Sequence, residues 1–568
     1  MTNNPTGKIL CLLLACIHSV LCAQTGLTPY QYSIRKKVDV THGAVVSAHP
    51  LASQAGVSIL KEGGNAVDAA IATQLALAVV YPGAGNIGGG GFMVAHLTSG
   101  KNITLDYRER APAKATRDMY LDASGNPQPN LSVNGHLAAG VPGTVAGIFA
   151  ELNYAKLPFS KLVGPAIELA EKGFAITAAE ARNLNSTQEA FIKYNTVRPV
   201  FVKDGGWKAG DTLVQKDLAA TLRRIRDKGA KGFYEGETAK LITEEMQRGK
   251  GIITASDLAG YKAKEREPAV FGYKGYTVVT MPLPGSGGVP LQQMLKMAEE
   301  QPLKEYGFAS LKAVHIMTEI ERLAYADRAR YLGDRDYYSV PVKTLTSSAY
   351  LHKRLAQIDP DKAGNSKDIR AGVISPLSEE TTHLDVYDKE GNAVSITTTL
   401  NGGYGSKVVV AGAGFLLNNE MDDFSIKPGV PNMYGAVGAE ANAIVPGKRM
   451  LSSMSPTLVL DKGKVIIVVG TPGGTTITTS VFQTLIDILD FGMSTEDAVN
   501  KPKFHHQWLP DEIFVEPGFP ADVRGQLEKM GYKVSQRGSI GRTEVIRIDG
   551  GRIEAVGDGR GEDTADGY

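Results

Sequence analysis

The sequence predicts an α+β fold in which antiparallel β-sheets are covered by helices. Alternating apolar runs predict hairpins at 91–97 with 102–108, at 381–387 with 393–400, and at 457–460 with 464–469. Long helix patterns with capped starts and glycine stops lie between them. Sheets and helices of this kind bury their apolar faces against each other in stacked layers. We therefore expect layers of sheet and helix.

Length and charge restrict the class of protein. The chain has 568 residues, enough for about three to four domain-sized units. Its 61 Lys and Arg residues nearly balance its 60 Asp and Glu residues. A balanced chain argues against nucleic acid or an anionic membrane surface as the partner.

The first residues resemble a secretory signal over 1–23. A short polar region ending at Lys8 precedes an apolar stretch from Ile9 to Cys22, and Ala23 follows. The stretch is shorter than the roughly 20 residues that a membrane span needs. A lipid anchor at Cys16 is less favoured, because Leu14 is bulky for such a site. All three cysteines lie within the signal, so the mature chain would lack disulfides, thiol catalysis and cysteine metal sites.

Glycine and asparagine residues mark the ends of the first predicted helices. A helix pattern over 50–63 ends at Gly63, and Asn65 can cap a second, Ala-rich helix to about Val80. The second helix is apolar nearly all round, which indicates a core helix. The run Gly83 to Gly88 has the letters of a dinucleotide fingerprint, but it follows a helix and leads into a strand. We interpret these glycines as allowing close backbone packing.

The rest of the chain divides into helical, exposed and catalytic segments. Residues 140–330 are mostly helix-like, and 357–380 are polar without a sustained period, as in an exposed segment. A helix is expected over about 475–490, after the third hairpin. His505 and His506 are neighbours on the chain, and adjacent side chains rarely share one metal ion. We therefore predict structural roles for them and no metal site.

The second hairpin is a candidate nucleophile site. Its threonines alone are compatible with an ordinary β-hairpin, because threonine is common in strands. A polar segment precedes Thr381, however, and glycine-rich turns follow both this hairpin and the next. If Thr381 became an N-terminus, its own α-amine could accept the hydroxyl proton, since an unperturbed α-amine has a pKa near 7.7 to 8.0.

The full mature chain resembles the γ-glutamyltransferase (γ-glutamyl transpeptidase, glutathione hydrolase) family of Ntn-hydrolases. The motifs that carry the resemblance are residues 49–53, 86–93, 108–112, 381–405, 417–424, 451–457, 472–474, 504–507 and 567–568. The resemblance implies an αββα four-layer sandwich and a precursor that cuts itself between Glu380 and Thr381. The products would be a large subunit of 357 residues (24 to 380) and a small catalytic subunit of 188 (381 to 568), associated as a heterodimer within one Ntn-hydrolase unit.

The resemblance also assigns catalytic roles. Thr381 would attack a γ-glutamyl amide and form an acyl-enzyme, and Thr399 would orient it. Gly473 and Gly474 lie at a predicted helix start, where backbone amides suit an oxyanion. The donors would be glutathione and other γ-glutamyl compounds. Water would give hydrolysis, and an amino acid or dipeptide would give transpeptidation, with no cofactor.

Residues for the two charges of the donor are implied in the same way. Arg108 resembles the clamp for the α-carboxylate, with Ser452 and Ser453 as hydroxyl donors. The α-ammonium would be held by Asn401, Glu420 and Asp423. The stretch 428–438 resembles the lid loop of bacterial members, with Tyr434 as the cover. With the signal, the lid favours a periplasmic or secreted bacterial enzyme.

One departure and two alternatives stay open. Asp385 stands where the family usually has Ser or Thr, and alternation places it on the strand face of Thr381 and His383. It could lie near the site, or strand twist could carry it to the edge, which we favour. The first alternative function is a cephalosporin or glutaryl acylase of the same fold, and Asp423 argues against it because a carboxylate there suits an ammonium. The second is an uncleaved, non-enzymatic exported binding protein.

Overall fold

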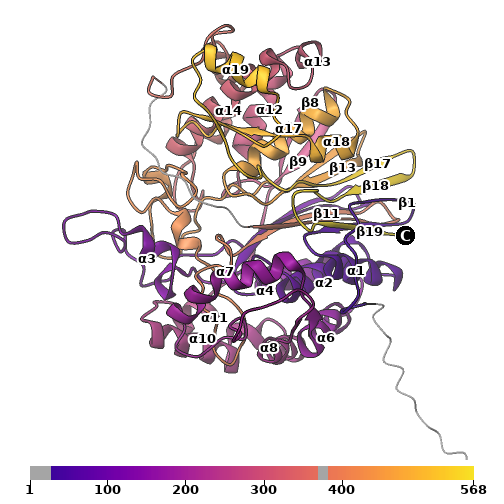
Figure 1. The fold of residues 1–568 in the computed structure, drawn as a ribbon, viewed down its shortest axis with the longest axis vertical. Coiled ribbons are helices and arrows are strands. Elements are labelled where there is room, and N and C mark those ends of the chain that lie inside the picture. The colour runs from indigo at the N-terminus through magenta and orange to yellow at the C-terminus, as the bar shows by residue number, and fades with distance from the viewer. Residues whose placement is uncertain (1–26, 369–380) are drawn as a thin grey trace, which may run out of the picture.

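A computed structural model describes residues 27–368 and 381–568 as four layers, with two stacked antiparallel sheets between two layers of helices (Figure 1). The predicted α+β sandwich is confirmed. Residues 1–23, Glu380 and the end of the exposed segment lie outside the described residues. The described part of that segment, 357–368, is mostly exposed and contains no helix or strand.

The first sheet holds the second predicted hairpin at its centre. In order across the sheet, its strands are β19 (Thr564–Gly567), β2 (Ala44–Ser47), β10 (Thr382–Tyr387), β11 (Ala393–Thr399), β3 (Gly90–His96), β4 (Asn102–Asp106) and β7 (Lys264–Arg266). All neighbours pair antiparallel. Strands β10 and β11 are therefore flanked on both sides and have no free edge.

The second sheet packs on the first. In order, its strands are β1 (Lys37–Val40), β18 (Arg552–Val556), β17 (Glu544–Asp549), β13 (Lys464–Gly470), β12 (Thr457–Asp461), β9 (Tyr276–Thr280) and β8 (Ala269–Tyr273). Buried apolar side chains such as Phe92, Val279 and Val468 fill the space between the sheets. Each sheet contains strands from both 24–380 and 381–568, so neither part completes a sheet alone.

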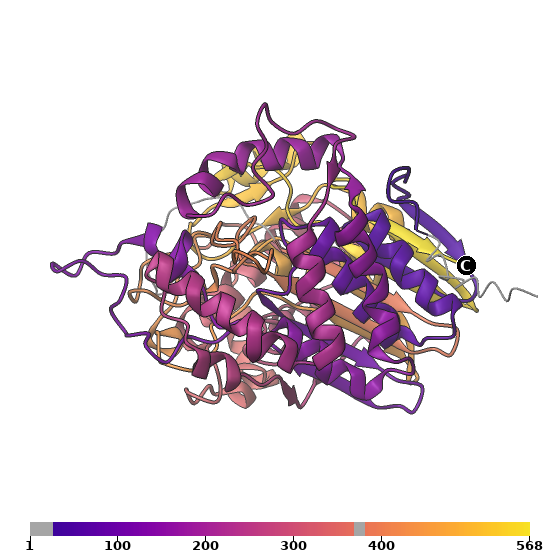
Figure 2. The same cartoon turned by 90° about the horizontal axis from the view of Figure 1, so that it is seen from below.

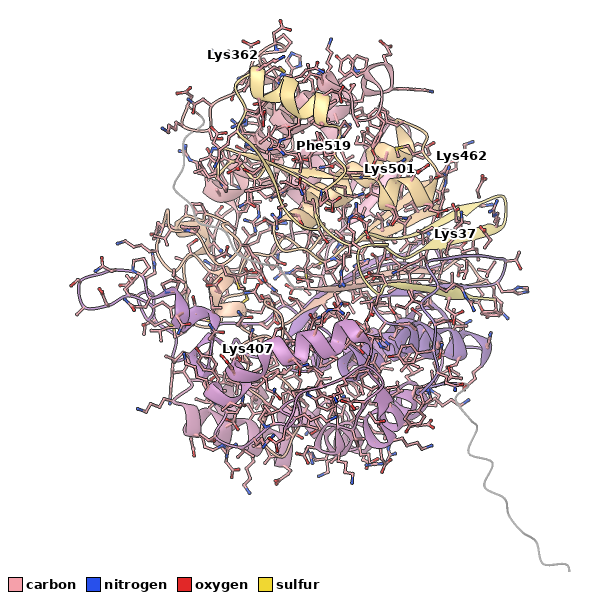
Figure 3. The ribbon with its side chains drawn as sticks, in the orientation of Figure 1. Lys37, Lys362, Lys407, Lys462, Lys501 and Phe519 are labelled. Carbon is pink, nitrogen blue, oxygen red and sulfur yellow. The ribbon has the colours of Figure 1, made fainter. Side chains whose placement is uncertain are left out.

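One helical layer covers the first sheet, below it in Figure 1 and toward the viewer in Figure 2. Its helices are α1 (Pro50–Lys61), α2 (Ala66–Val80), α4 (Thr144–Glu151), α6 (Gly164–Lys172), α7 (Ala178–Tyr194), α8 (Lys216–Lys228), α10 (Gly236–Gly249) and α11 (Ala255–Ala259). Asn65 caps α2, and all of α2 is buried, as the sequence predicts. Lys407, which follows β11, lies beside these helices in Figure 3, and its carbonyl accepts from Asn195 after α7.

The other helical layer covers the second sheet (Figure 1). Its helices are α12 (Gln292–Glu299), α13 (Leu303–Tyr306), α14 (Leu311–Tyr331), α16 (Ser348–Leu355), α17 (Thr476–Leu489), α18 (Thr495–Asn500) and α19 (Ala521–Lys529). A small sheet of β14 (Phe504–His505), β15 (Ile513–Val515) and β16 (Val534–Gln536) adjoins it, whereas β5 (Phe174–Ala175) and β6 (Thr212–Leu213) pair near α6 and α7. None of the described helices is both long and apolar enough to span a bilayer.

The mostly helical reading of 140–330 missed the five strands β5 to β9 within it. In the edge strands β7 and β8, exposed or half-buried residues interrupt the apolar alternation. Strand β8, for example, is the last strand of its sheet and leaves Val270 about half exposed. Edge strands of this kind are short and carry a weak sequence signal.

The glycine run before β3 packs against the end of β11. A Cβ added to Gly89 would lie 2.0 Å from the carbonyl oxygen of Thr399 and 2.7 Å from Oδ1 of Asn86. Both neighbours are buried and hydrogen-bonded to each other, because Asn86 Nδ2 donates to that carbonyl. The run therefore permits a close approach that no other residue type allows.

We predict that Gly89→Ala lowers the free energy of unfolding by about 1–3 kcal/mol, the usual cost of overpacking a rigid site. Denaturant unfolding of the purified protein measures it. The control is Gly525→Ala within α19, where an added Cβ meets nothing within 4 Å. That variant should be unchanged or stabilised by up to about 1 kcal/mol, since alanine favours helix. Equal stability of both variants would contradict the close packing at Gly89.

Candidate active site

The predicted nucleophile lies opposite its predicted partner. Thr382 pairs with Thr398 across β10 and β11, so Thr381 and Thr399 face each other at the next position. Their hydroxyl oxygens are 3.5 Å apart, and both residues are buried. The register of the hairpin thus brings the two side chains together.

Thr399 is held in place from its other side. The backbone N–H of Asn401 donates to Oγ1 of Thr399 over 2.7 Å. Asn401 adopts a positive φ of 73°, a conformation that asparagine tolerates better than most residues. Because that N–H occupies an acceptor position of Thr399, the Thr399 hydroxyl hydrogen is available to another acceptor.

Gly473 and Gly474 form the turn between β13 and α17. Their φ values of 133° and 49° are in the region that favours glycine. Gly474 lines the same cavity as Thr381, and the carbonyl of Gly473 accepts from the N–H of Thr476 in the first turn of α17. A helix of 14 residues begins here, and the start of such a helix is positively polarised by its aligned peptide dipoles. The turn can therefore stabilise an anion beside Thr381.

Arg108 is the centre of a buried cluster of charges. It follows β4, is 1% exposed, and its Nη1 lies 2.6 Å from Oε2 of Glu420. Its Nη2 forms an ion pair with Asp423. Nη1 also lies 3.6 Å from Oε2 of Glu109. One guanidinium therefore faces three carboxyl groups.

Burial sets the protonation of this cluster. It raises the pKa of Glu109 to about 8 and that of Glu420 well above its ordinary value, and Arg108 opposes the shift in both. Burial also raises the pKa of Asp423, against the effect of Arg108 and Arg328. Asp423 has the most exposed carboxylate of the three and lines the cavity. It is therefore the carboxylate that a ligand can reach.

Ser452 and Ser453 lie on the segment that leads into β12. The backbone of Ser452 is fixed at both ends, because its N–H donates to Pro284 and its carbonyl accepts from Ser286 Oγ. The carbonyl of Ser453 accepts from Thr478 Oγ1 of α17. Both side chains line the cavity with Arg108.

The loop predicted to be a lid lines the cavity through Asn432, Tyr434 and Ala436. The hydroxyl of Tyr434 donates to the carbonyl of Asn401 over 2.5 Å, and Tyr434 is 6% exposed. Gln507 Nε2 donates to the Tyr434 carbonyl over 3.3 Å. Asn432, on the same loop, donates to Asp423. The loop is therefore connected to the hairpin and to the charge cluster.

The structure brings the predicted residues together around one cavity. Thr381, Thr399, Arg108, Asn401, Asp423, Ser452, Ser453, Tyr434 and Gly474 line it. Two predicted residues do not line the cavity themselves. Glu420 contacts Arg108, which lines it, and Gly473 directly precedes Gly474, which also lines it. The sequence analysis missed Arg328, Asn432, Ala436, Met454, Thr475 and Ile477, which also line it. Most of these adjoin a recognised motif, but Arg328 lies within α14 and had only a helix pattern around it.

The favoured placement of Asp385 at an edge is wrong. Asp385 is buried within β10, between β2 and β11, and its Oδ1 lies 2.9 Å from Nε2 of His383. His383 Nδ1 is 2.9 Å from Oγ1 of Thr397. The sheet order decides this, because β19 and β2 extend the sheet beyond β10. Asp385 thus faces the second sheet, where its charge acts on Glu544 of β17, and it does not line the cavity.

The paired histidines have separate partners. His505 lies 2.8 Å from Oγ1 of Thr479 and 2.9 Å from Oε1 of Gln507, whereas His506 Nε2 lies 3.4 Å from Asp511. Burial lowers the pKa of His505 to about 3 and that of His506 to about 4. Across residues 27–368 and 381–568, no group of three or more potential ligands could hold a metal ion.

Comparison with known families agrees with this geometry. Residues 52–568 match the family described as Gamma-glutamyltranspeptidase. The chain belongs to the gamma-glutamyltranspeptidase family. A relative from Escherichia coli (strain K12) named glutathione hydrolase proenzyme is 48% identical over 552 residues, which cover 95% of each chain.

Two solved structures superimpose on this chain. A cephalosporin acylase from Bacillus halodurans superimposes with a TM-score of 0.82 at 28% identity, over 95% of this chain and 98% of that chain. A gamma-glutamyltranspeptidase chain from Helicobacter pylori superimposes with a TM-score of 0.56 at 48% identity, over 60% of this chain and 97% of that chain.

We predict that Arg108→Met destabilises the protein by about 3–5 kcal/mol, because it leaves the buried carboxyl groups of Glu420 and Asp423 without their cation. Denaturant unfolding measures the loss. Arg552→Met is the control, since Arg552 pairs with Asp39 on the surface and its loss should leave stability unchanged. If the two variants were equally stable, the cluster would not hold this region together.

Proposed function

We propose that this protein is a self-processing γ-glutamyltransferase and glutathione hydrolase. One observation carries the proposal: an accessible carboxylate, Asp423, and a guanidinium, Arg108, line one cavity with the Thr381–Thr399 pair. A γ-glutamyl donor carries an α-carboxylate and an α-ammonium at one end and the reacting amide at the other. Family membership and the name of the E. coli relative support the same assignment.

The first reaction would be the cut between Glu380 and Thr381. The Thr381 hydroxyl oxygen attacks the carbonyl carbon of Glu380, the C–N bond breaks, and the amide becomes an ester with a free Thr381 amine. Water then hydrolyses the ester, leaving a carboxylate on Glu380 and the hydroxyl on Thr381. The relative's designation as a proenzyme supports a cut, and the H. pylori chain corresponds in length to about three fifths of this chain, near that of residues 24–380.

Catalysis would use the new N-terminus. The Thr381 amine accepts the hydroxyl proton as the oxygen attacks the γ-carbonyl of the donor. Backbone N–H groups around Gly473 and Gly474 stabilise the oxyanion, and the leaving amine takes the proton. Water or the amine of an amino acid or dipeptide then attacks the γ-glutamyl ester and regenerates Thr381. Every step uses groups of this chain and its substrates, so the proposal includes no cofactor.

On donor binding, the charged groups of the donor would replace some of the contacts that Arg108 and Asp423 make with each other. The α-carboxylate binds Arg108 and the hydroxyls of Ser452 and Ser453, while the α-ammonium binds Asp423, with Glu420 and Asn401 near it. Each buried charge keeps an opposite partner in the exchange, which limits the cost of desolvation. Tyr434 covers the bound group and excludes water.

A glutaryl or cephalosporin acylase is the second candidate, favoured by the TM-score of 0.82 with the B. halodurans acylase. Its glutaryl donors lack the α-ammonium, so they would leave Asp423 without a cationic ligand. Turnover of γ-glutamyl and glutaryl anilides separates the two candidates.

We also propose that residues 1–23 direct export to the periplasm or medium and are removed.

We predict that Thr381→Ala stays a single chain on a denaturing gel and releases no γ-glutamyl group. The wild type should give two bands, the smaller one beginning at Thr381 by N-terminal sequencing. An uncut wild type would instead support an exported binding protein.

Two variants control for this change. Thr381→Ser keeps a hydroxyl and should still mature, although more slowly. Thr382→Ala removes the neighbouring buried hydroxyl, which has no hydrogen-bond partner in the described part of the chain, and should mature and turn over normally. Maturation and turnover by Thr381→Ala would refute the assignment of the nucleophile.

Substrate affinity should depend on pH through Asp423. Burial raises the pKa of this carboxyl, so it takes up a proton at a higher pH than an ordinary aspartate. The ammonium of the donor binds the ionised form, and KM for a γ-glutamyl anilide should therefore rise as the pH falls through this raised pKa.

The control for this pH effect is a glutaryl anilide, which has no ammonium. Titration of the Thr381 amine acts on both donors, so the difference between their KM profiles isolates Asp423. In Asp423→Asn the two profiles should become parallel. Parallel profiles in the wild type would contradict a role for Asp423 in binding the ammonium.

A further inference from the structure

A second guanidinium, that of Arg328, lines the same cavity as Thr381 and Arg108. Arg328 lies on α14, a helix of the layer that covers the second sheet, and it is 7% exposed. It enters the site from residues 24–380, whereas Ser453, which it contacts, belongs to 381–568. No motif of the sequence analysis includes it.

The contacts of Arg328 leave its charge poorly compensated. Nη2 donates to Oγ of Ser453 over 3.1 Å, and Nε is buried without a hydrogen-bond partner in the described chain. Asp423 contributes a favourable field, while Arg108 contributes an unfavourable one. Within the described residues, Arg328 forms no ion pair with a carboxylate, in contrast to Arg108.

A buried guanidinium stays protonated, because its ordinary pKa exceeds 12. Burying such a charge without an anionic partner is costly, and proteins seldom keep one without a ligand or function. An anion that entered the cavity between Arg108 and Ser453 would reduce this cost. The α-carboxylate of the proposed donor is such an anion.

The hydrogen bond from Arg328 to Ser453 also determines whether the Ser453 hydroxyl acts as a donor or an acceptor toward a ligand. A guanidinium has only donors, so Oγ of Ser453 must act as the acceptor in this contact. The hydroxyl hydrogen then points elsewhere and can be donated to a second group. Since Ser453 lines the cavity, a carboxylate bound there can accept it.

We infer that Arg328 is a specificity-determining and positioning residue, which orients Ser453 as a hydrogen-bond donor and supplies a second positive charge for the α-carboxylate of the donor. The inference rests on the proposed function and extends it to a residue of α14. Arg328 acts on the donor through Ser453 and through its charge.

The test compares two donors that differ only in the α-carboxylate. They are γ-glutamyl p-nitroanilide and 4-aminobutyryl p-nitroanilide, which keeps the ammonium and the reacting amide. In Arg328→Met, the ratio of kcat/KM for the first donor to that for the second should fall by about tenfold or more, as for a lost charge-assisted hydrogen bond. Arg328→Lys should recover part of the ratio, because lysine keeps the positive charge but lacks the planar, branched set of N–H donors of a guanidinium.

Arg330→Met is the matched control. Arg330 lies on the same helix, is exposed, and does not line the cavity, so this variant removes the same charge and should leave the ratio unchanged. If Arg328→Met does not yield folded protein, Arg328→Gln, which removes the charge and keeps N–H donors, takes its place. A ratio that stays at the wild-type value in the soluble Arg328 variant, with both donors slowed equally, would overturn the inference.

A double-mutant comparison tests the link to Ser453. In a Ser453→Ala background, the effect of Arg328→Met on the ratio should become smaller than in the wild type. An undiminished effect would overturn the positioning role. If wild-type protein released p-nitroaniline from neither donor, the proposed function would fail and this inference with it, whereas an unchanged ratio in an active enzyme overturns the inference alone.

Discussion

The register between β10 and β11 is the constraint on which the site depends. It places Thr381 opposite Thr399, and the neighbouring strands β2 and β3 hold β10 and β11 within the sheet. The glycines before β3 let Thr399 pack against the backbone, and the facing strand β13 ends at the turn that carries Gly473 and Gly474. A slip of one residue would turn the Thr381 side chain to the other face of the sheet and separate it from this turn.

Buried charge is the second feature on which the site depends. Arg108 faces three carboxyl groups, and Arg328 adds a guanidinium that has no carboxylate in contact within the described chain. Such an arrangement is costly, because within the described residues neither the excess carboxyl groups nor Arg328 are fully paired. A ligand with one carboxylate and one ammonium offers both missing partners. The same site would therefore gain stability and specificity from one substrate class, and an acyl group without an ammonium would leave Asp423 unmatched.

The sequence predicted what depends on local patterns and motifs. The central hairpin, the capped helix α2 and the glycine turn before α17 each have a signal within a few neighbouring residues, and family resemblance supplied Arg108 and Asp423. Features that depend on distant partners were missed. Asp385 is buried only because β2 and β19 extend the sheet beyond β10, and β8 is a strand only because it pairs with β9. Arg328 lines the cavity because of where α14 packs in the fold. Spacing along the chain does not indicate that position.

The central claim is that Thr381 carries the γ-glutamyl group during turnover. The most direct measurement is the intact mass of the fragments after wild-type protein is mixed with a γ-glutamyl donor and quenched in acid within the first turnovers, followed by peptide mapping. The account predicts that the fragment beginning at Thr381 gains the mass of one γ-glutamyl residue, attached to the Thr381 side chain and removed by added hydroxylamine. Continued donor turnover with the γ-glutamyl group on another residue, or with no acylated fragment even when the acyl-enzyme is made to accumulate, would contradict it.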